Sequence, residues 1–115
     1  MKLVVAVIQP IRLRAVRSAL GKLGVHRFTV GDAMGYARQG GRPETFRGHE
    51  YQTQLLRKVA VEVVVNDDFV EQTIDCLIEH ARSSVAGNVG DGKVFVLPVD
   101  DVIQISDGSR GTGAV

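Results

Sequence analysis

Aromatic residues and cysteine are scarce in this sequence. It has no tryptophan, two tyrosines and four phenylalanines. An RNA-binding sheet displays stacking aromatic side chains, so this composition argues against nucleic-acid recognition by stacking. The single cysteine, Cys76, excludes an intramolecular disulfide and a cysteine metal cluster. The histidines, His26, His49 and His80, lie too far apart in sequence to show metal-ligand spacing.

Charge of one sign and long apolar runs are also lacking. The formal net charge is +1, so there is no broad basic field to attract nucleic acid. No apolar run approaches the roughly 20 residues that a membrane span requires. The opening MKLVVAVIQP is too short for a secretory signal. We therefore expect a cytoplasmic protein whose 115 residues form one domain.

What the chain does have is a repeated pattern of strand, helix and strand. Residues 2–8 are β-branched and apolar, Pro10 suits the first turn of a helix, and Gly24 suits its end. Asp67 or Asp68 can cap a second helix. The expected elements are strands over residues 2–8, 28–36, 59–65, 94–99 and 102–105, and helices over residues 10–23 and 70–81. This order predicts an α+β, ferredoxin-like βαββαβ fold, with two helices on one face of an antiparallel sheet.

The expected sheet is apolar on both faces. The strands over residues 2–8 and 59–65 carry valine, leucine, isoleucine or alanine at nearly every position. Because the helices can cover only one face, the other would leave a large apolar surface in water. A second copy of the chain is the simplest cover, so we expect a homo-oligomer.

The connection over residues 36–58 is unusually long for a hairpin. It is rich in glycine and basic, with only Glu44 and Glu50 as acidic residues. We interpret it as an arm that contacts a partner. The tail over residues 106–115 is rich in glycine and serine, and we expect it to be mobile.

A glycine-rich loop, AGNVGDGK, occupies residues 86–93. Its backbone N–H groups and Lys93 suit a phosphate, and we expect a positive φ at Gly90, which β-branched residues resist. A Walker A loop would continue with serine or threonine and a helix, which this loop does not. Taken alone, a stretch of this kind is more often a tight turn into an edge strand than a ligand site.

Several stretches together resemble the PII family of nitrogen-regulatory signal-transduction proteins. They are MKLVVAVIQP, GYARQGG, FRGHEYQ, KVAVEVVV with the following DD, and VGDGKVFV. The resemblance runs from residue 1 to about residue 105. It implies one PII-like domain over residues 1–115, with a T-loop-like arm over residues 37–57 and a phosphate loop over residues 86–93.

The resemblance further implies a homotrimer without catalytic activity. ATP and ADP would compete for the clefts between subunits, and 2-oxoglutarate would bind beside Mg-ATP. The arm would dock on an ammonium channel or another nitrogen-metabolism transporter or enzyme. Gln39 matches a residue that helps to hold Mg and 2-oxoglutarate, Lys58 one that meets the oxoacid carboxylate, and Tyr51 a uridylylation site. The positions that match nucleotide-binding residues, or lie in the phosphate loop, are Thr29, Gly35, Arg38, Glu62, Val64, Gly87, Gly90, Asp91, Gly92 and Lys93.

Two departures from the family pattern keep an alternative open. Gln104 and Ser106 stand where the family usually has phosphate-binding arginines, and Arg110 is the nearby cation of the tail. The alternative is a divergent PII-like sensor of ADP, AMP or a small anion such as bicarbonate, which regulates a transporter or enzyme outside nitrogen metabolism. Glu62 lies in an otherwise apolar strand, so we expect a buried carboxylate, which needs a partner. A structural salt bridge with Lys58 or Lys93 is as compatible with this position as a role at the nucleotide.

Overall fold

The computed structural model describes residues 1–38 and 53–115 of the chain. Among the described residues, no helix is long and apolar enough to cross a membrane. Short 3-10 turns precede both helices and the last strand, and another forms close to the C-terminus. The helices and strands are β1 (Lys2–Ile8), α1 (Leu13–Leu23), β2 (Thr29–Arg38), β3 (Thr53–Val65), α2 (Val70–Ala81) and β4 (Gly92–Pro98).

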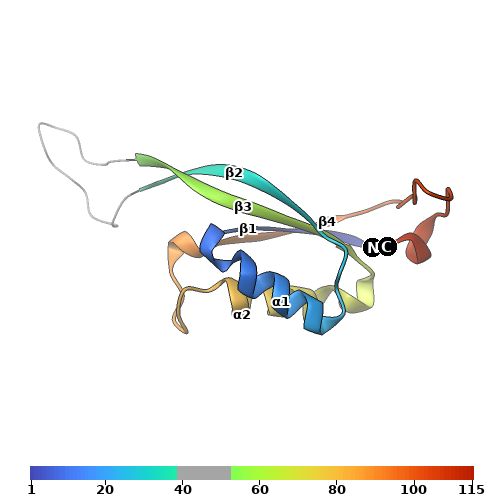
Figure 1. The fold of residues 1–115 in the computed structure, drawn as a ribbon, viewed down its shortest axis with the longest axis horizontal. Helices are drawn as coiled ribbons and strands as arrows, with labels where there is room; N and C mark the ends of the chain where they lie inside the picture. Colours follow the sequence, from blue (N-terminus) through green and yellow to red (C-terminus); the bar gives the residue numbers. More distant parts are fainter. Residues whose placement is uncertain (39–52) are drawn as a thin grey trace, which may run out of the picture.

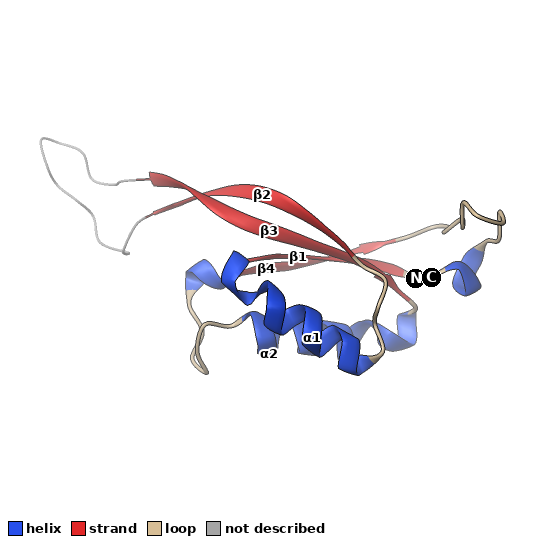
Figure 2. Ribbon diagram, viewed as in Figure 1, coloured by secondary structure: helices blue, strands red, loops and turns tan. Residues whose placement is uncertain are grey.

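The four strands form one antiparallel sheet in the order β2-β3-β1-β4. Both helices pack on the same face of this sheet, and the opposite face is left open (Figure 1 and Figure 2). The element order and the two layers confirm the predicted ferredoxin-like α+β fold.

The core lies between the helices and the sheet. Alternate residues of β1 and β3 point toward the helices, since side chains of a strand alternate between its faces. From the helices, Val16, Leu20 and Leu77 are at most 1% exposed and meet these strands. The buried strand residues are Val4, Ala6, Ile8, Val59, Val61, Val63 and Val65.

Of the two helix ends predicted from sequence, one is confirmed and the other is wrong. Gly24 ends α1 in a left-handed conformation with φ of 94°, as predicted. The prediction that Asp67 or Asp68 caps the second helix is wrong, because neither the 3-10 turn Asp67–Phe69 nor α2 has a side-chain cap. Asp67 instead accepts a hydrogen bond from the Met1 amino group, which lies 2.7 Å from its Oδ1 atom. This contact lowers the pKa of Asp67.

The two strands that flank the predicted arm extend into its range of residues 37–57, since β2 ends at Arg38 and β3 begins at Thr53. β2 and β3 stay in register from Thr29 opposite Glu62 to Arg38 opposite Thr53. The pairing continues beyond the end of β1, so the two strands project from the sheet as a ribbon (Figure 1). An uninterrupted antiparallel ladder satisfies the backbone groups of both strands. The remainder of the predicted arm, residues 39–52, lies outside the described residues.

The predicted strand over residues 102–105 does not form. Ile103 makes only an isolated bridge with Arg110, and the Gln104 N–H donates to the Ser109 carbonyl at 2.8 Å. The chain therefore turns back on itself after β4 instead of adding a strand. In the tail, Gly111–Ala114 forms a 3-10 turn and Ala114 is buried. The mobility of residues 106–115 in solution stays a prediction.

Candidate functional site

The glycine-rich loop joins α2 to β4 and is held together by the carboxylate of Asp91. Its Oδ2 atom accepts the backbone N–H of Asn88 at 2.8 Å and that of Ser83 at 3.1 Å. The Asn88 side chain also donates a hydrogen bond to the Ser83 hydroxyl at 3.3 Å, which links the two residues that Asp91 holds. Asp91, predicted as a nucleotide-binding residue, therefore shapes the loop in this chain.

The surroundings of Asp91 favour its ionised form. Burial acts to raise the pKa of Asp91, but the hydrogen bonds from Ser83 and Asn88 and the charge of Arg12 outweigh burial and lower the pKa below 3.8. Arg12 also donates to the Ser83 carbonyl at 2.8 Å, which ties the loop to the segment before α1. The loop is therefore anchored by a stable negative charge at neutral pH.

The three glycines of the loop have different roles. Gly87 has φ of 74° and Gly92 has φ of 113°, which side chains rarely adopt. Gly90 is not among the described glycines with positive φ, so the expectation of a positive φ there is wrong. A Cβ atom at Gly90 would have only Gln9 nearby, with its Nε2 atom at 3.8 Å. The local fold therefore leaves room for a side chain at Gly90.

The carbonyl of Gly90 links the loop to two other elements. Lys58 of β3 donates to it from Nζ at 2.7 Å, and Gln9, which follows β1, donates from Nε2 at 3.2 Å. The predicted carboxylate-binding lysine therefore lies at the glycine loop. Sequence reasoning identified neither Gln9 nor Arg12, and the only signal for Gln9 was its position directly after the strand Lys2–Ile8.

Several predicted residues share the open face of the sheet. Directly paired residues of antiparallel strands point to the same side, and the register places Thr29, Glu62, Val5 and Phe95 in one row. Glu62 is exposed on this face, so the expectation of a buried carboxylate is wrong for the single chain. Among the described residues it forms no ion pair with either lysine.

The predicted nucleotide residues form two groups within one chain. Thr29 and Gly35 belong to the edge strand β2, whereas Lys93 and the glycine loop belong to the opposite edge, at β4. Three strand spacings, about 14 Å, separate the two edges. Glu62 and Val64 lie on β3, between them.

Three further predicted residues are in or next to the arm. The backbone of Arg38 is the last of β2 and pairs with Thr53. Gln39 and Tyr51 lie outside the described residues. The predicted Mg²⁺ site is therefore described only in part, and within residues 1–38 and 53–115 no three His, Cys, Asp or Glu side chains could hold a metal ion.

The tail does not bring a cation to the glycine loop of its own chain. β4 runs away from the loop, so the tail lies at the opposite end of that strand (Figure 1). Arg110 forms an ion pair with Asp101 there, at 3.4 Å between Nη1 and Oδ2. Arg110 therefore does not replace, within one chain, the arginines expected at Gln104 and Ser106.

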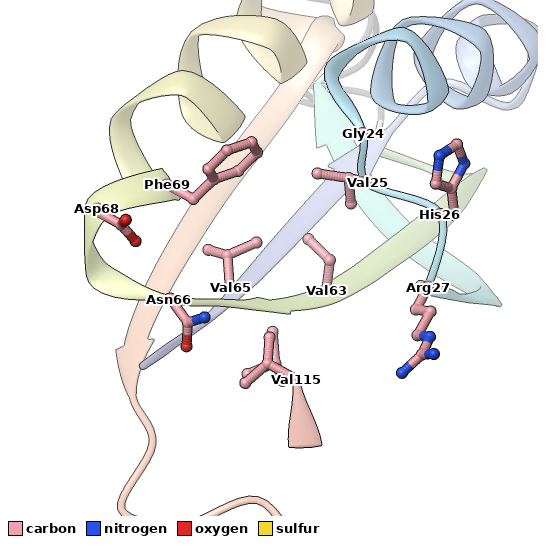
Figure 3. Close-up of a pocket in the computed structure, with 11 residues that line it drawn as sticks. Gly24, Val25, His26, Arg27, Val63, Val65, Asn66, Asp68, Phe69 and Val115 are labelled. Carbon is pink, nitrogen blue, oxygen red and sulfur yellow. The ribbon is translucent and has the colours of Figure 1, made fainter. Parts of the chain in front are cut away.

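Two concave regions flank the sheet. A groove of about 680 Å³ runs between α2 and β4, and Gly87, Asp91 and Lys93 are among its lining residues. A second pocket, of about 350 Å³, lies where β3 meets the loop after α1 (Figure 3). Of the predicted site residues, the second pocket contains only Val64. The groove beside the glycine loop is therefore the one that adjoins the candidate site.

Comparisons with known proteins agree with this architecture. The family model for nitrogen regulatory protein P-II matches residues 1–109. The chain is 43% identical to nitrogen regulatory protein P-II of Nostoc punctiforme over the full length of both, and 44% identical to nitrogen regulatory protein GlnK1 of Methanosarcina mazei, covering all of this chain and 97% of the relative. The crystal structure of Arabidopsis thaliana PII bound to citrate superposes with a TM-score of 0.80 at 38% identity, over 99% of this chain and 91% of that one.

Proposed function

The chain belongs to the P-II family of nitrogen regulatory proteins, and we propose that it binds an adenine nucleotide between the subunits of a homotrimer. In this proposal the bound nucleotide and a second effector determine the conformation of the arm. The arm then regulates a transporter or an enzyme of nitrogen metabolism. The protein acts as a regulator in the cytoplasm and not as an enzyme.

The open face of the sheet supports the oligomer. Phe95 is 49% exposed and Leu97 is 45% exposed on β4, and both pair with apolar residues of β1 on that face. Burial of apolar surface stabilises by about 25 cal/mol per Å², so the face gains from contact with other copies. The apolar residues of the open face along β1, β3 and β4 are Leu3, Val5, Val7, Ala60, Val64, Phe95 and Leu97.

One observation carries the nucleotide proposal: Lys58 Nζ lies 2.7 Å from the carbonyl of Gly90, in the loop that leads to Lys93. The ammonium group of Lys58 thus contacts the glycine-rich loop whose last residue is Lys93, and cations beside backbone N–H groups favour phosphate. The second group of predicted residues, on β2 and β3, lies toward the other side of the same open face. A nucleotide between chains would contact the loop of one chain and Thr29, Glu62 and Val64 of the next.

The effector part of the proposal rests on Gln39 and Lys58, which flank the arm. Lys58 can pair with a carboxylate, as 2-oxoglutarate would supply, and Mg²⁺ would enter with ATP through the phosphates. The Arabidopsis thaliana PII structure was solved with citrate, which is also a carboxylate ligand. Tyr51 is the proposed modification site of the arm.

A divergent sensor is the second candidate function. Gln104 and Ser106 replace two cations, and Arg110 pairs with Asp101 away from the loop. Hydrogen bonds to charged groups contribute about 1.5–3 kcal/mol each, so losing two weakens a triphosphate more than a diphosphate or monophosphate. The loss of the two cations therefore favours binding of ADP or AMP over binding of ATP.

Isothermal titration calorimetry tests these alternatives directly. ATP, ADP, AMP and bicarbonate are titrated separately, and each nucleotide is repeated with Mg²⁺ and 2-oxoglutarate. The main proposal expects ATP and ADP to bind, with 2-oxoglutarate binding only beside Mg-ATP. Binding of ADP, AMP or bicarbonate without a 2-oxoglutarate response would favour the divergent sensor. Absence of binding by every nucleotide would overturn the nucleotide proposal.

A further inference from the structure

We propose that Gln9 and Lys58 are positioning residues that together orient the glycine loop through the carbonyl of Gly90. We call these two donors and their shared acceptor the Gly90 clamp. Through Lys58, the clamp makes the affinity of the loop for phosphate depend on the ribbon that leads to the arm. The inference rests on the proposed function, because it concerns the regulation of the same site.

The strand register explains why Lys58 reaches the loop. β1 pairs with β3 as far as Val59 opposite Ile8, and Ile8 is also opposite Gly92 of β4. Lys58 is therefore the first residue of β3 beyond the end of β1. Two strand spacings, about 10 Å, separate β3 from β4. The long lysine side chain crosses this gap where β1 no longer intervenes.

The clamp fixes the orientation of the Gly90 carbonyl, which the backbone of Gly90 does not fix by itself. Gly90 has no positive φ, and a Cβ atom there would meet nothing closer than 3.8 Å. The carbonyl is instead fixed by a charged donor at 2.7 Å and a neutral donor at 3.2 Å. Charge-assisted hydrogen bonds are the stronger kind, so Lys58 contributes more than Gln9.

The position of Lys58 links the clamp to the arm. Its neighbours toward the arm belong to the β2–β3 ribbon, which has no support from β1. A change in the ribbon therefore moves Lys58 relative to Gly90. Such a displacement leaves Gln9 as the only donor of the clamp.

The test compares ADP affinity in Gln9→Ala, Lys58→Met and the double variant, with Lys22→Met on α1 as the control. A neutral hydrogen bond contributes about 0.5–1.5 kcal/mol, so Gln9→Ala should weaken ADP binding about two- to tenfold and Lys58→Met should weaken it more. Adding Gln9→Lys to Lys58→Met should recover much of the loss, because the new ammonium lies beside the same carbonyl. Melting temperatures should stay close to that of the unaltered protein.

The amide signals of Gly90 and Asp91 in nucleotide-free protein provide an independent readout by NMR. Both signals should shift in Gln9→Ala and in Lys58→Met, but not in Lys22→Met. Unchanged signals in both clamp variants would overturn the inference, and so would a Gln9→Lys change that restores nothing. If the unaltered protein binds no ADP but its amide signals respond as expected, the nucleotide proposal fails while the clamp stands.

Discussion

Gly92 lies so close to β1 that a Cβ atom at this position would be 1.8 Å from the carbonyl oxygen of Val7. Its backbone, with φ of 113° and ψ of −164°, is one that essentially only glycine adopts. This contact fixes where the glycine loop ends and β4 begins.

Gly92→Ala should therefore destabilise the protein, and Gly90→Ala should not. Backbone strain of this kind costs about 1–3 kcal/mol, and the overlap with Val7 adds to it. Gly90 has room for a methyl group and no positive φ, so it is the matched control. Chemical denaturation of both variants provides the comparison. Equal stability of the two would show that the Gly92–Val7 contact does not constrain the loop.

Lys93→Ala should weaken adenine-nucleotide binding without altering assembly. A hydrogen bond to a charged group contributes about 1.5–3 kcal/mol, which corresponds to roughly a ten- to hundredfold loss of affinity. Lys22→Ala, on the helical side of the chain, is the control. Calorimetry measures the affinity, and light scattering checks the oligomer. Unaltered affinity would mean that the glycine loop is only a turn.

A charge on the open face should disrupt the oligomer. Phe95→Asp places a carboxylate in the middle of the apolar face, where burial without a partner is costly. Val85→Asp is the control, because Val85 is 95% exposed in the loop after α2. Light scattering should give a trimer for the unaltered protein and Val85→Asp, and smaller species for Phe95→Asp. A stable 12.4 kDa monomer of the unaltered protein would contradict the predicted assembly.

The loop should keep its conformation in mild acid. The pKa of Asp91 is lower in the folded chain than its ordinary value of 3.8, so its contribution to stability is present above that value and is lost as the pH falls through the folded pKa. The Asn88 and Ser83 amide signals should therefore not titrate between about pH 7 and pH 5. In Asp91→Ala these signals should be displaced at every pH. A titration of the two amides near pH 6 would contradict this assignment.

The sequence predicted the fold well where hydrophobic patterns were long. The apolar runs over residues 2–8 and 59–65 predicted β1 and most of β3, and Pro10 and Gly24 marked the two ends of the segment that contains α1. The extension of β2 and β3 into a ribbon was missed, since the pairing of Arg38 with Thr53 depends on long-range register and not on local composition.

The candidate site was predictable in its composition but not in its contacts. The glycine-rich stretch and Lys93 identified the loop. Gln9 and Arg12 come from a segment 71 to 81 residues before their partners, and only the folded sheet brings that segment to the loop. Glu62 was expected to be buried because its neighbours in sequence are apolar. It lies on the open face, which a single chain leaves uncovered.

The central claim is that one nucleotide contacts two chains, and mixed oligomers test it most directly. Lys93→Ala alters the glycine-loop side of each proposed site, and Glu62→Ala alters the opposite side. Each variant alone should bind ADP weakly at all sites. If the two are denatured together and refolded in equal amounts, random assembly should place an intact loop against an intact Glu62 in about a quarter of the sites.

Calorimetry on the mixture should therefore detect about a quarter of the sites with the affinity of the unaltered protein. The two variants mixed without refolding are the control and should show none. If a nucleotide instead lay across the open face of one chain, every site would lack one of the two residues. A refolded mixture that binds no better than the separate variants would contradict the intersubunit site.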